Sequence, residues 1–381
     1  MSNEKPFAEI AGAGLAGLAA AAALAQRGWR VRVHERGRDL REIGAGIYLW
    51  QNALDALREL GVYDKVATIG APSTTPRLLL DHRGQEVDLR RMSDWVPELI
   101  VILRTELHRI LAECAVKHGA EIVTNSLVLG ADPEGRLEFA NGLGPKADLV
   151  IGADGVFSRV RDSLRLAVEI FDMKDGCGRH LIPRKDGDSI NTRRIEMWNG
   201  GRRVGIAPTS KDFHYVFLCC PESDIQGRVQ QPFNLEAWVS SHPQYREYLE
   251  RLPRHPEEYW RPFFNVTCSS WTKGRVAIVG DAAHGMAPNL GQGAGVAIVN
   301  AVVMARALAT SKDVPEALRR WEASERPYVE RTQRMSFLYG YFGTRWPRKL
   351  LDLRSRILPL LARTDLYQRN FRVAIEHKPA I

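Results

Sequence analysis

The sequence lacks most signatures of a secreted, membrane-spanning or metal-binding protein. Its five cysteines are odd in number and scattered, with no CxxC pair and no companion histidine spacing, so neither a disulfide framework nor a metal site is expected. The longest alanine-rich apolar run, at residues 15–25, is too short to span a bilayer. No internal repeat or low-complexity segment occurs. These absences favour a cytoplasmic protein with no membrane partner.

Acidic residues are scarce in one part of the chain only. Residues 331–381 contain eleven Lys or Arg against three Asp or Glu, which accounts for the whole net charge of +8. The rest of the chain is balanced and shows no aromatic-basic interleaving, so a nucleic-acid partner is not expected. We expect this segment to form helices with a solvated basic face. A field that steers an anionic substrate or NAD(P)H is the alternative.

A glycine-rich turn, GAGLAG at residues 12–17, follows an apolar strand and precedes an alanine- and leucine-rich helix. In a dinucleotide fingerprint, Gly12 permits the sharp turn, Gly14 lets the backbone approach a pyrophosphate, and Gly17 lets the helix pack on the strand. A second strand ends at Glu35, whose carboxylate can accept hydrogen bonds from ribose hydroxyls and would repel a 2′-phosphate. The motif therefore predicts FAD or NAD in this half of the protein.

Two later strands also end in an acidic residue. Asp154 follows DLVIGA and Asp281 follows RVAIVG, and ligands of open α/β sheets bind outside the carboxyl ends of such strands. Between them, residues 166–264 lose the alternation of strands and helices and contain short runs typical of an antiparallel sheet.

The predicted fold class is therefore α/β, with a doubly wound parallel, Rossmann-like cofactor domain, an inserted antiparallel-sheet substrate domain and a C-terminal helical segment. The predicted ranges are 1–75, 98–165 and 265–325 for the cofactor domain, 76–97 and 166–264 for the substrate domain, and 326–381 for the helical segment.

Three motifs in a fixed order, GAGLAG, IGADGVFSRVR and GDAAHGMAPNLGQG, resemble those of the class A FAD-dependent aromatic-ring monooxygenases, the group typified by para-hydroxybenzoate and salicylate hydroxylases. The resemblance covers about residues 7–330. Within this family the chain is most similar to the pyridine-ring oxygenases of the 2-methyl-3-hydroxypyridine-5-carboxylate oxygenase type, through GAGIYLWQNAL, IEMWN and AIVNA. Most family members carry an acidic pair near Asn300, whereas this chain and the pyridine-ring enzymes do not.

The resemblance implies bound FAD, with NADH or NADPH as a transient co-substrate. It places Asp281 on the ribityl chain, Pro288 beside the flavin ring, and the start of the next helix at the flavin pyrimidine edge. Capping of the helix that starts near Phe157 is the alternative role for Asp154. The expected cofactor-binding residues are Gly12, Gly14, Ala16, Gly17, Glu35, Arg36, Arg104, Val128, Asp154, Asp281, Pro288, Gly291, Gly293 and Ala294.

In the reaction that the resemblance implies, NAD(P)H reduces the flavin, and O2 then supplies an electrophilic oxygen to an electron-rich ring. Arg203 can pair with a substrate carboxylate or phenolate, and Tyr215 on the next strand can donate a hydrogen bond to the same ring. Both match substrate residues of the pyridine-ring oxygenases, and Tyr48 is a third pocket candidate. Arg203, Tyr215 and Pro288 are thus the expected catalytic residues.

Arg194 and Arg202 are alternatives to Arg203 for the substrate anion. The predicted activity is hydroxylation, with or without ring opening, of a hydroxypyridine carboxylate or a hydroxynicotinate. Two alternatives stay open at this point: a benzenoid phenolic acid of the salicylate or hydroxybenzoate type as substrate, or a flavin-binding protein without turnover. The oligomeric state expected is a monomer or a homodimer.

Overall fold

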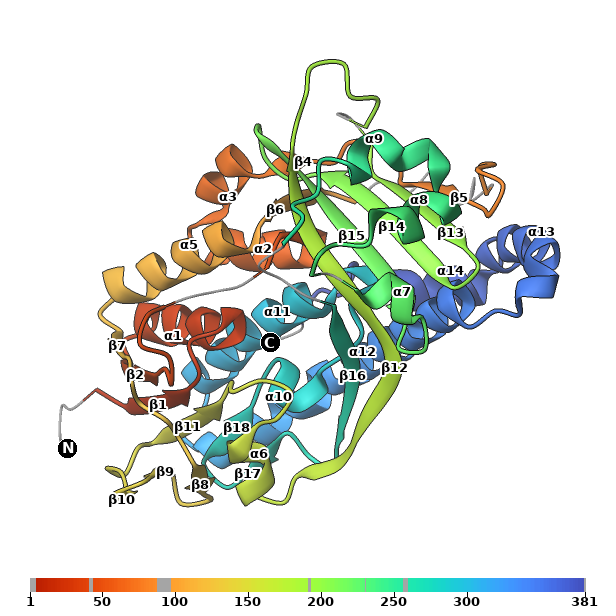
Figure 1. The fold of residues 1–381 in the computed structure, drawn as a ribbon. Helices are drawn as coiled ribbons and strands as arrows, with labels where there is room; N and C mark the ends of the chain where they lie inside the picture. Colours follow the sequence, from red (N-terminus) through yellow and green to blue (C-terminus); the bar gives the residue numbers. More distant parts are fainter. Residues whose placement is uncertain are drawn as a thin grey trace.

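The structure is a computed structural model that describes residues 5–40, 44–87, 97–190, 193–229, 231–255 and 260–379. Two six-stranded sheets and a long C-terminal helix dominate the fold (Figure 1). This arrangement confirms the α/β class with a parallel sheet, an antiparallel sheet and C-terminal helices. Residues 88–96, part of the predicted 76–97 segment, lie outside the described residues.

The first sheet is parallel except at one edge. Its strand order is β17-β18-β11-β1-β2-β7, and only the β17–β18 pair is antiparallel. The chain order changes direction at β1, which lies between β2 and β11, so a ligand is expected outside the carboxyl ends of these strands. The bounds are β1 (Phe7–Ala11), β2 (Arg30–His34), β7 (Glu121–Val123), β11 (Leu149–Gly152), β17 (Thr272–Lys273) and β18 (Val276–Ile278).

Helix α1 (Leu15–Gln26) is buried along almost its whole surface. It packs between the parallel sheet, α5 (Arg104–Lys117) and α11 (Gly293–Ala309), and its alanines allow these helices to approach closely. A helix that is apolar all round is typical of a protein interior, which accounts for the alanine run of the sequence. Figure 1 shows α1 and α11 near each other above β1 and β11.

The second sheet has the order β16-β12-β15-β14-β13-β5 and is antiparallel except for the β13–β5 pair. Its longest strand, β12, pairs with β16 at one end and with β15 at the other, and curves past the parallel sheet (Figure 1). The bounds are β5 (Leu78–Leu80), β12 (Ala167–Pro183), β13 (Ile195–Asn199), β14 (Arg202–Pro208), β15 (Phe213–Pro221) and β16 (Arg261–Cys268).

Smaller elements complete the two layers. Helices α8 and α9 cover one face of the antiparallel sheet with Trp238 and Leu249, which leaves the other face for the cavity described below. Two three-stranded sheets are also present: β3-β6-β4, which packs on α2, α3, α5 and α11, and β10-β9-β8, which contacts β1 of the parallel sheet through β9. The bounds are β3 (Gly46–Trp50), β4 (Ala71–Pro72), β6 (Leu99–Leu103), β8 (Gly130–Asp132), β9 (Arg136–Phe139), β10 (Gly142–Leu143), α2 (Gln51–Glu59), α3 (Tyr63–Ile69), α6 (Arg159–Ser163), α7 (Ile225–Arg228), α8 (Leu235–Ser241), α9 (Arg246–Leu249) and α10 (Asp281–His284).

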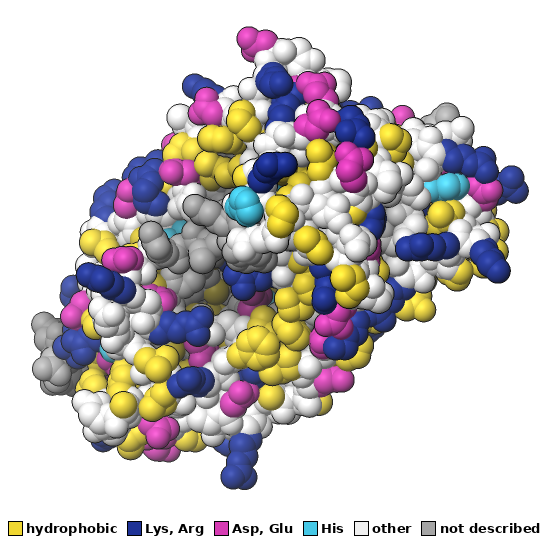
Figure 2. Space-filling model, in the orientation of Figure 1, with side chains coloured by type: hydrophobic (Ala, Val, Ile, Leu, Met, Phe, Trp, Pro, Cys, Tyr) yellow, Lys and Arg dark blue, Asp and Glu magenta, His cyan; other side chains and the backbone are white. Residues whose placement is uncertain are grey.

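The C-terminal segment forms three helices, α12 (Val314–Thr344), α13 (Leu351–Ala362) and α14 (Asp365–Arg372). Helix α12 extends along both sheets (Figure 1), and Trp321 near its start donates a hydrogen bond to the Asn300 carbonyl of α11. Tyr339 near its end donates one to Glu196 of β13. Lys and Arg side chains gather at the end of the molecule where α13 lies (Figure 2). None of the helices within the described ranges combines the length and apolar character needed to cross a membrane.

Several histidines lie in the interior, and three of them resist protonation. His284 Nε2 is 3.1 Å from Asn300 Nδ2, and His214 Nε2 is 3.1 Å from a carboxylate oxygen of Asp188. Burial lowers the pKa of His214, His242 and His284 to about 4, because the charged imidazolium would lose its hydration. These histidines are therefore neutral at neutral pH, and their pKa values in the unfolded chain are higher.

We predict a loss of stability on acidification that comes partly from these histidines. As pH falls from about 6.5 towards 4, the unfolded chain takes up protons that the folded protein refuses, and each histidine costs up to about 3 kcal/mol. His284→Gln should reduce the slope of the free energy of unfolding between pH 6.5 and 4, measured by urea denaturation. His255→Gln, at an exposed position, is the control and should retain the parent slope. Equal slopes in both variants would contradict the prediction.

Candidate functional site

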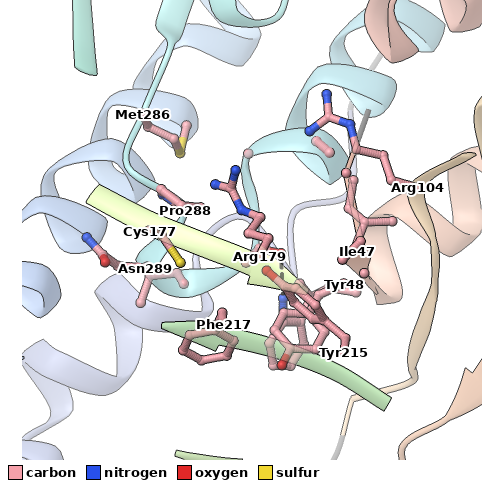
Figure 3. Close-up of a pocket in the computed structure, with 18 of the residues that line it drawn as sticks. Ile47, Tyr48, Arg104, Cys177, Arg179, Tyr215, Phe217, Met286, Pro288 and Asn289 are labelled. Carbon is pink, nitrogen blue, oxygen red and sulfur yellow. Dashed lines mark hydrogen bonds between the residues drawn. The ribbon is translucent and has the colours of Figure 1, made fainter. Parts of the chain in front are cut away.

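A cavity of about 580 Å³ lies between the carboxyl edge of the parallel sheet and the open face of the antiparallel sheet. Glycine loops of the first sheet line one half, and side chains of β13, β14 and β15 line the other. Figure 3 shows Pro288, Arg179, Tyr215 and Tyr48 around this space, with Arg104 at one end. The cavity therefore joins the segments in which the sequence places cofactor and substrate residues.

The GAGLAG turn presents the start of α1 to the cavity. Gly12 has a φ of +100°, and a Cβ there would lie 2.5 Å from the carbonyl oxygen of Ala153 on the neighbouring loop. A Cβ at Gly17 would overlap the carbonyl oxygen of Gly12, whereas a Cβ at Gly14 would have no atom within 4 Å. Close packing thus explains two of the glycines. The remaining glycine, Gly14, lines the cavity together with Leu15 and Ala16 at the N-terminus of α1.

The Glu35 carboxylate is fixed beside this turn. It accepts hydrogen bonds from the backbone N–H of Ala13 at 3.1 Å and of Gly37 at 2.8 Å. Two backbone donors hold a negative charge next to the glycine turn, where the ribose of a dinucleotide binds in this type of fold. Arg36, the next residue, has an exposed side chain.

Six of the expected cofactor residues do not line the cavity: Gly12, Gly17, Glu35 and Arg36, which belong to the first loop and the end of β2, and also Val128 and Asp154. Val128 is buried in the hydrophobic core of the parallel-sheet layer. The Asp154 carboxylate accepts hydrogen bonds from the Ser158 hydroxyl at 2.5 Å and from the backbone N–H of Arg159 at 2.8 Å, so it caps the start of α6. The capping role that the sequence left open is therefore present in the structure.

The second glycine-rich loop passes the opposite side of the cavity. Asp281 and Pro288 line it, and Gly291 adopts a φ of +64° beneath Tyr48, whose ring a Cβ would overlap. Helix α11 then begins at Gly293, so that Gly293 and Ala294 present the positive end of its dipole to the cavity.

These features fit FAD. The open space at Gly14 and the N-terminus of α1 suit a pyrophosphate, the Glu35 carboxylate suits the ribose, and the N-terminus of α11 suits a flavin edge that becomes negative on reduction. Among the residues that the structure describes, no cluster of His, Cys, Asp or Glu could hold a metal ion.

A buried charge network forms the inner wall. Glu196 of β13 pairs with Arg77 at 2.6 Å and accepts hydrogen bonds from Trp198 Nε1 at 2.7 Å and from the Tyr339 hydroxyl at 2.9 Å. Arg203 of β14, only 1% exposed, lies 3.9 Å from Glu196. Each of these side chains has a partner that compensates for its loss of hydration.

Arg203 has two further partners. Its guanidinium lies 3.7 Å from Asp175 and donates a hydrogen bond to Asn289 Oδ1 at 2.6 Å. Asn289 follows Pro288, so Arg203 holds the loop that passes the opposite side of the cavity. The charge of Arg203 is therefore already paired within the protein.

Arg194 differs from Arg203. It lines the cavity, its Nε donates to the Ser73 hydroxyl at 2.9 Å, and its guanidinium lies over the rings of Tyr48 and Trp50 at 5.7 and 5.4 Å. No carboxylate of the described residues lies within 4.0 Å of it. Burial lowers the pKa of Arg194 to about 10, so it keeps its positive charge at neutral pH.

Tyr48 and Tyr215 close the substrate half. Their ring centroids are 6.3 Å apart, and Gly46 approaches the Tyr215 ring so closely that a Cβ there would lie 2.5 Å from it. Burial raises the pKa of Tyr48 to about 12 and that of Tyr215 well above its ordinary value. Both phenols are therefore neutral and available as hydrogen-bond donors. His214, the neighbour of Tyr215, points to the other face of the sheet, as the alternation of a strand requires.

The structure brings most of the expected residues to one cavity. Of the expected set, those on its wall are Gly14, Ala16, Tyr48, Arg104, Arg203, Tyr215, Asp281, Pro288, Gly291, Gly293 and Ala294. Arg202 pairs with Asp224 at 2.6 Å and does not line the cavity. Sequence reasoning gave no role to Arg77, Arg179, Glu196, Asn289 or Phe371, although Glu196 belongs to the IEMWN motif.

The sequence matches the family described as FAD binding domain over residues 7–336. The chain is similar to the tetrameric form of 2-methyl-3-hydroxypyridine-5-carboxylic acid oxygenase, with a TM-score of 0.86 and 34% identity over 98% of this chain and 97% of that chain. It is 34% identical to 2-heptyl-3-hydroxy-4(1H)-quinolone synthase of Mycobacteroides abscessus, over 88% of this chain and 90% of that protein. It is 28% identical to 6-hydroxynicotinate 3-monooxygenase of Bordetella bronchiseptica, over 87% and 91% of the two chains.

The chain therefore belongs to the FAD-binding domain family. It is an FAD-dependent monooxygenase that uses NAD(P)H, and the enzyme class and cofactors predicted from the sequence are confirmed.

We predict that alanine substitutions of two glycines in the first loop have different effects, one on stability and one on FAD affinity. Gly17→Ala forces a methyl group onto the Gly12 carbonyl and should lower the stability of the FAD-free protein by about 1–3 kcal/mol. Gly14→Ala places its methyl group in open space, so stability should persist while FAD affinity falls. Thermal unfolding of stripped protein and fluorescence titration with FAD separate the two. If Gly14→Ala bound FAD with the affinity of the parent protein, the pyrophosphate would not bind at Gly14, which would contradict the prediction.

Proposed function

We propose that this monooxygenase inserts oxygen into a hydroxylated N-heteroaromatic ring that carries an anionic group, such as a hydroxypyridine carboxylate or a hydroxynicotinate. The observation that carries the proposal is the charge of the cavity wall. Among the described residues, six arginines line the cavity against three carboxylates, and Arg194 has no carboxylate partner. The likeness to a pyridine-carboxylic acid oxygenase and to a hydroxynicotinate monooxygenase supports the same ring class.

In this proposal, Arg194 binds the anionic group of the substrate and Tyr215 donates a hydrogen bond to the ring oxygen. Tyr48 stacks on Arg194 and fixes its position. Arg203, the residue expected from the sequence to bind the anion, instead positions Asn289 and Pro288, because its charge is paired with Asp175 and Glu196. When bound, FAD supplies the electrons from NAD(P)H and an electrophilic oxygen.

The protein's own part is to orient the ring and exclude water. No imidazole lies on the described wall of the cavity, and the neutral His284 is turned to Asn300. A substrate that binds with its ring hydroxyl ionised needs no protein base, and the positive cavity favours that ionised form. The division into cofactor, substrate and C-terminal parts stays a proposal, with the cavity between the first two.

A 2-alkyl-4(1H)-quinolone is the second candidate substrate. The Mycobacteroides abscessus relative is described as a 2-heptyl-3-hydroxy-4(1H)-quinolone synthase. One corner of the cavity is apolar and would suit an alkyl chain, with Trp50, Val87, Leu290 and Phe371 in one hydrophobic cluster.

We predict that a hydroxynicotinate or a hydroxypyridine carboxylate stimulates NAD(P)H oxidation and appears as an oxygenated product. The assay compares these acids with salicylate, 4-hydroxybenzoate and 2-heptyl-4(1H)-quinolone, and mass spectrometry of the products separates hydroxylation from ring opening. Stimulation and product formation by the alkylquinolone alone would overturn the proposal in favour of the second candidate. Product from the benzenoid acids alone would also overturn it.

Arg194 should decide affinity for the anionic group. Arg194→Gln removes a charge-assisted hydrogen bond of about 1.5–3 kcal/mol, so KM for the preferred acid should rise roughly 10- to 100-fold. The matched control is Arg202→Gln. Arg202 lies on β14 and pairs with Asp224 outside the cavity, so KM should stay near the parent value. Steady-state kinetics with the acid as variable substrate measure both. An unchanged KM in Arg194→Gln would remove this residue from the anion site.

A further inference from the structure

Two of the five cysteines face each other across neighbouring strands in the cavity wall. Cys177 of β12 and Cys219 of β15 are register partners in the antiparallel sheet, so their side chains leave the same face. Both line the cavity, and both are at least 95% buried. Figure 3 shows the Cys177 thiol beside Pro288 and Asn289.

The backbone spacing of such a pair permits a covalent bond. Residues directly opposite in an antiparallel pair have Cα atoms about 4.5–5.5 Å apart. Disulfides join Cα atoms about 4.4–6.8 Å apart, so a bond between these thiols requires no large backbone movement.

The surroundings distinguish the two thiols. Burial opposes ionisation of Cys177, but the neighbouring Cys219 thiol and the positive charges of Arg179 and Arg203 outweigh it and lower the pKa of Cys177. Burial holds the pKa of Cys219 well above its ordinary value. Burial also raises the pKa of Cys114, Cys220 and Cys268, none of which lines the cavity. Cys177 is thus the cysteine best suited to react as a thiolate.

We propose that Cys177 and Cys219 are an oxidative modification site that hydrogen peroxide converts to a disulfide within the cavity. Peroxide forms wherever reduced flavin meets dioxygen without a substrate to oxygenate, so the oxidant arises beside these thiols. The inference rests on the cavity as the oxygen-reacting site and not on the identity of the ring that is oxygenated.

The chemistry balances in two steps. The Cys177 thiolate attacks one oxygen of the peroxide, the O–O bond breaks, and the second oxygen leaves as water with the thiol proton, which yields a sulfenic acid. The Cys219 thiol then attacks the oxidised sulfur, the S–O bond breaks, and a second water leaves as the S–S bond forms. Two thiols are oxidised and one peroxide is reduced to two waters.

The disulfide would alter the substrate half of the cavity. It would join β12 to β15 next to Arg203, which positions the Pro288 loop, and close to Tyr215 on the same strand. We therefore expect oxidation to lower substrate-stimulated NAD(P)H oxidation, and reduction with dithiothreitol to restore it.

The test exposes FAD-loaded enzyme to graded hydrogen peroxide, then denatures it and counts thiols by alkylation and intact mass. The expected result is a loss of two of the five thiols, with a mass decrease of two hydrogen atoms and a cross-linked peptide pair that contains Cys177 and Cys219. Cys177→Ala and Cys219→Ala should each abolish the cross-link. Cys220→Ala, next in the strand but packed in the core of the opposite face, should retain it.

Three results would overturn the proposal. These are retention of all five thiols, a cross-link that persists in Cys177→Ala, and a bond between Cys219 and Cys220. Because thiols are counted without any substrate, failure here leaves the substrate proposal standing, and failure of the substrate panel leaves the thiol result intact.

Discussion

The inner half of the cavity depends on the carboxylate of Glu196. It receives Arg77 from the segment before β5, Trp198 from its own strand and Tyr339 from the C-terminal helix, and it lies near Arg203 of β14. A buried carboxylate without these partners would be unstable, at a cost of about 3–5 kcal/mol. Arg77 would lose its ion pair without the carboxylate, whereas Arg203 would keep Asp175. Glu196 thereby holds four parts of the chain around the substrate space. Arg194 is not part of this network and has no carboxylate partner among the described residues.

The parts of the site that could be predicted from sequence are those fixed by local backbone. Gly12, Gly17 and Gly291 occupy positions where a side chain would collide with a neighbouring loop or ring. Such positions require glycine, so the spacing of the glycines can be recognised in the sequence. The positions of Asp281 and Pro288 at the site could be predicted as well, because both residues lie in the glycine-rich loop that contains Gly291. Both sheets could also be predicted from the sequence, because the periodicities of strands and helices are local. The alternation of strands and helices indicates the parallel sheet, and its interruption indicates the antiparallel sheet.

The inner wall could not be predicted because its energetics are set by distant partners. Arg77 and Glu196 are 119 residues apart, and Glu196 and Tyr339 are 143 apart. Nothing in either local sequence shows that Arg203 is already paired while Arg194 is not. Asn300 shows the same limit. Its motif is visible in the sequence, but its contact with His284 and the hydrogen bond from Trp321 to its carbonyl depend on the packing of α11 against α10 and α12.

Helix α12 acts as a strut between the two sheets. Trp321 ties it to α11 over the cofactor half, and Tyr339 ties it to the Glu196 network over the substrate half, about 27 Å further along the helix axis. A hinge motion of one sheet against the other would have to break a buried contact at one end of this strut. The two contacts therefore oppose a separation of the parallel sheet from the antiparallel sheet, so that both walls of the cavity are tied to one common helix.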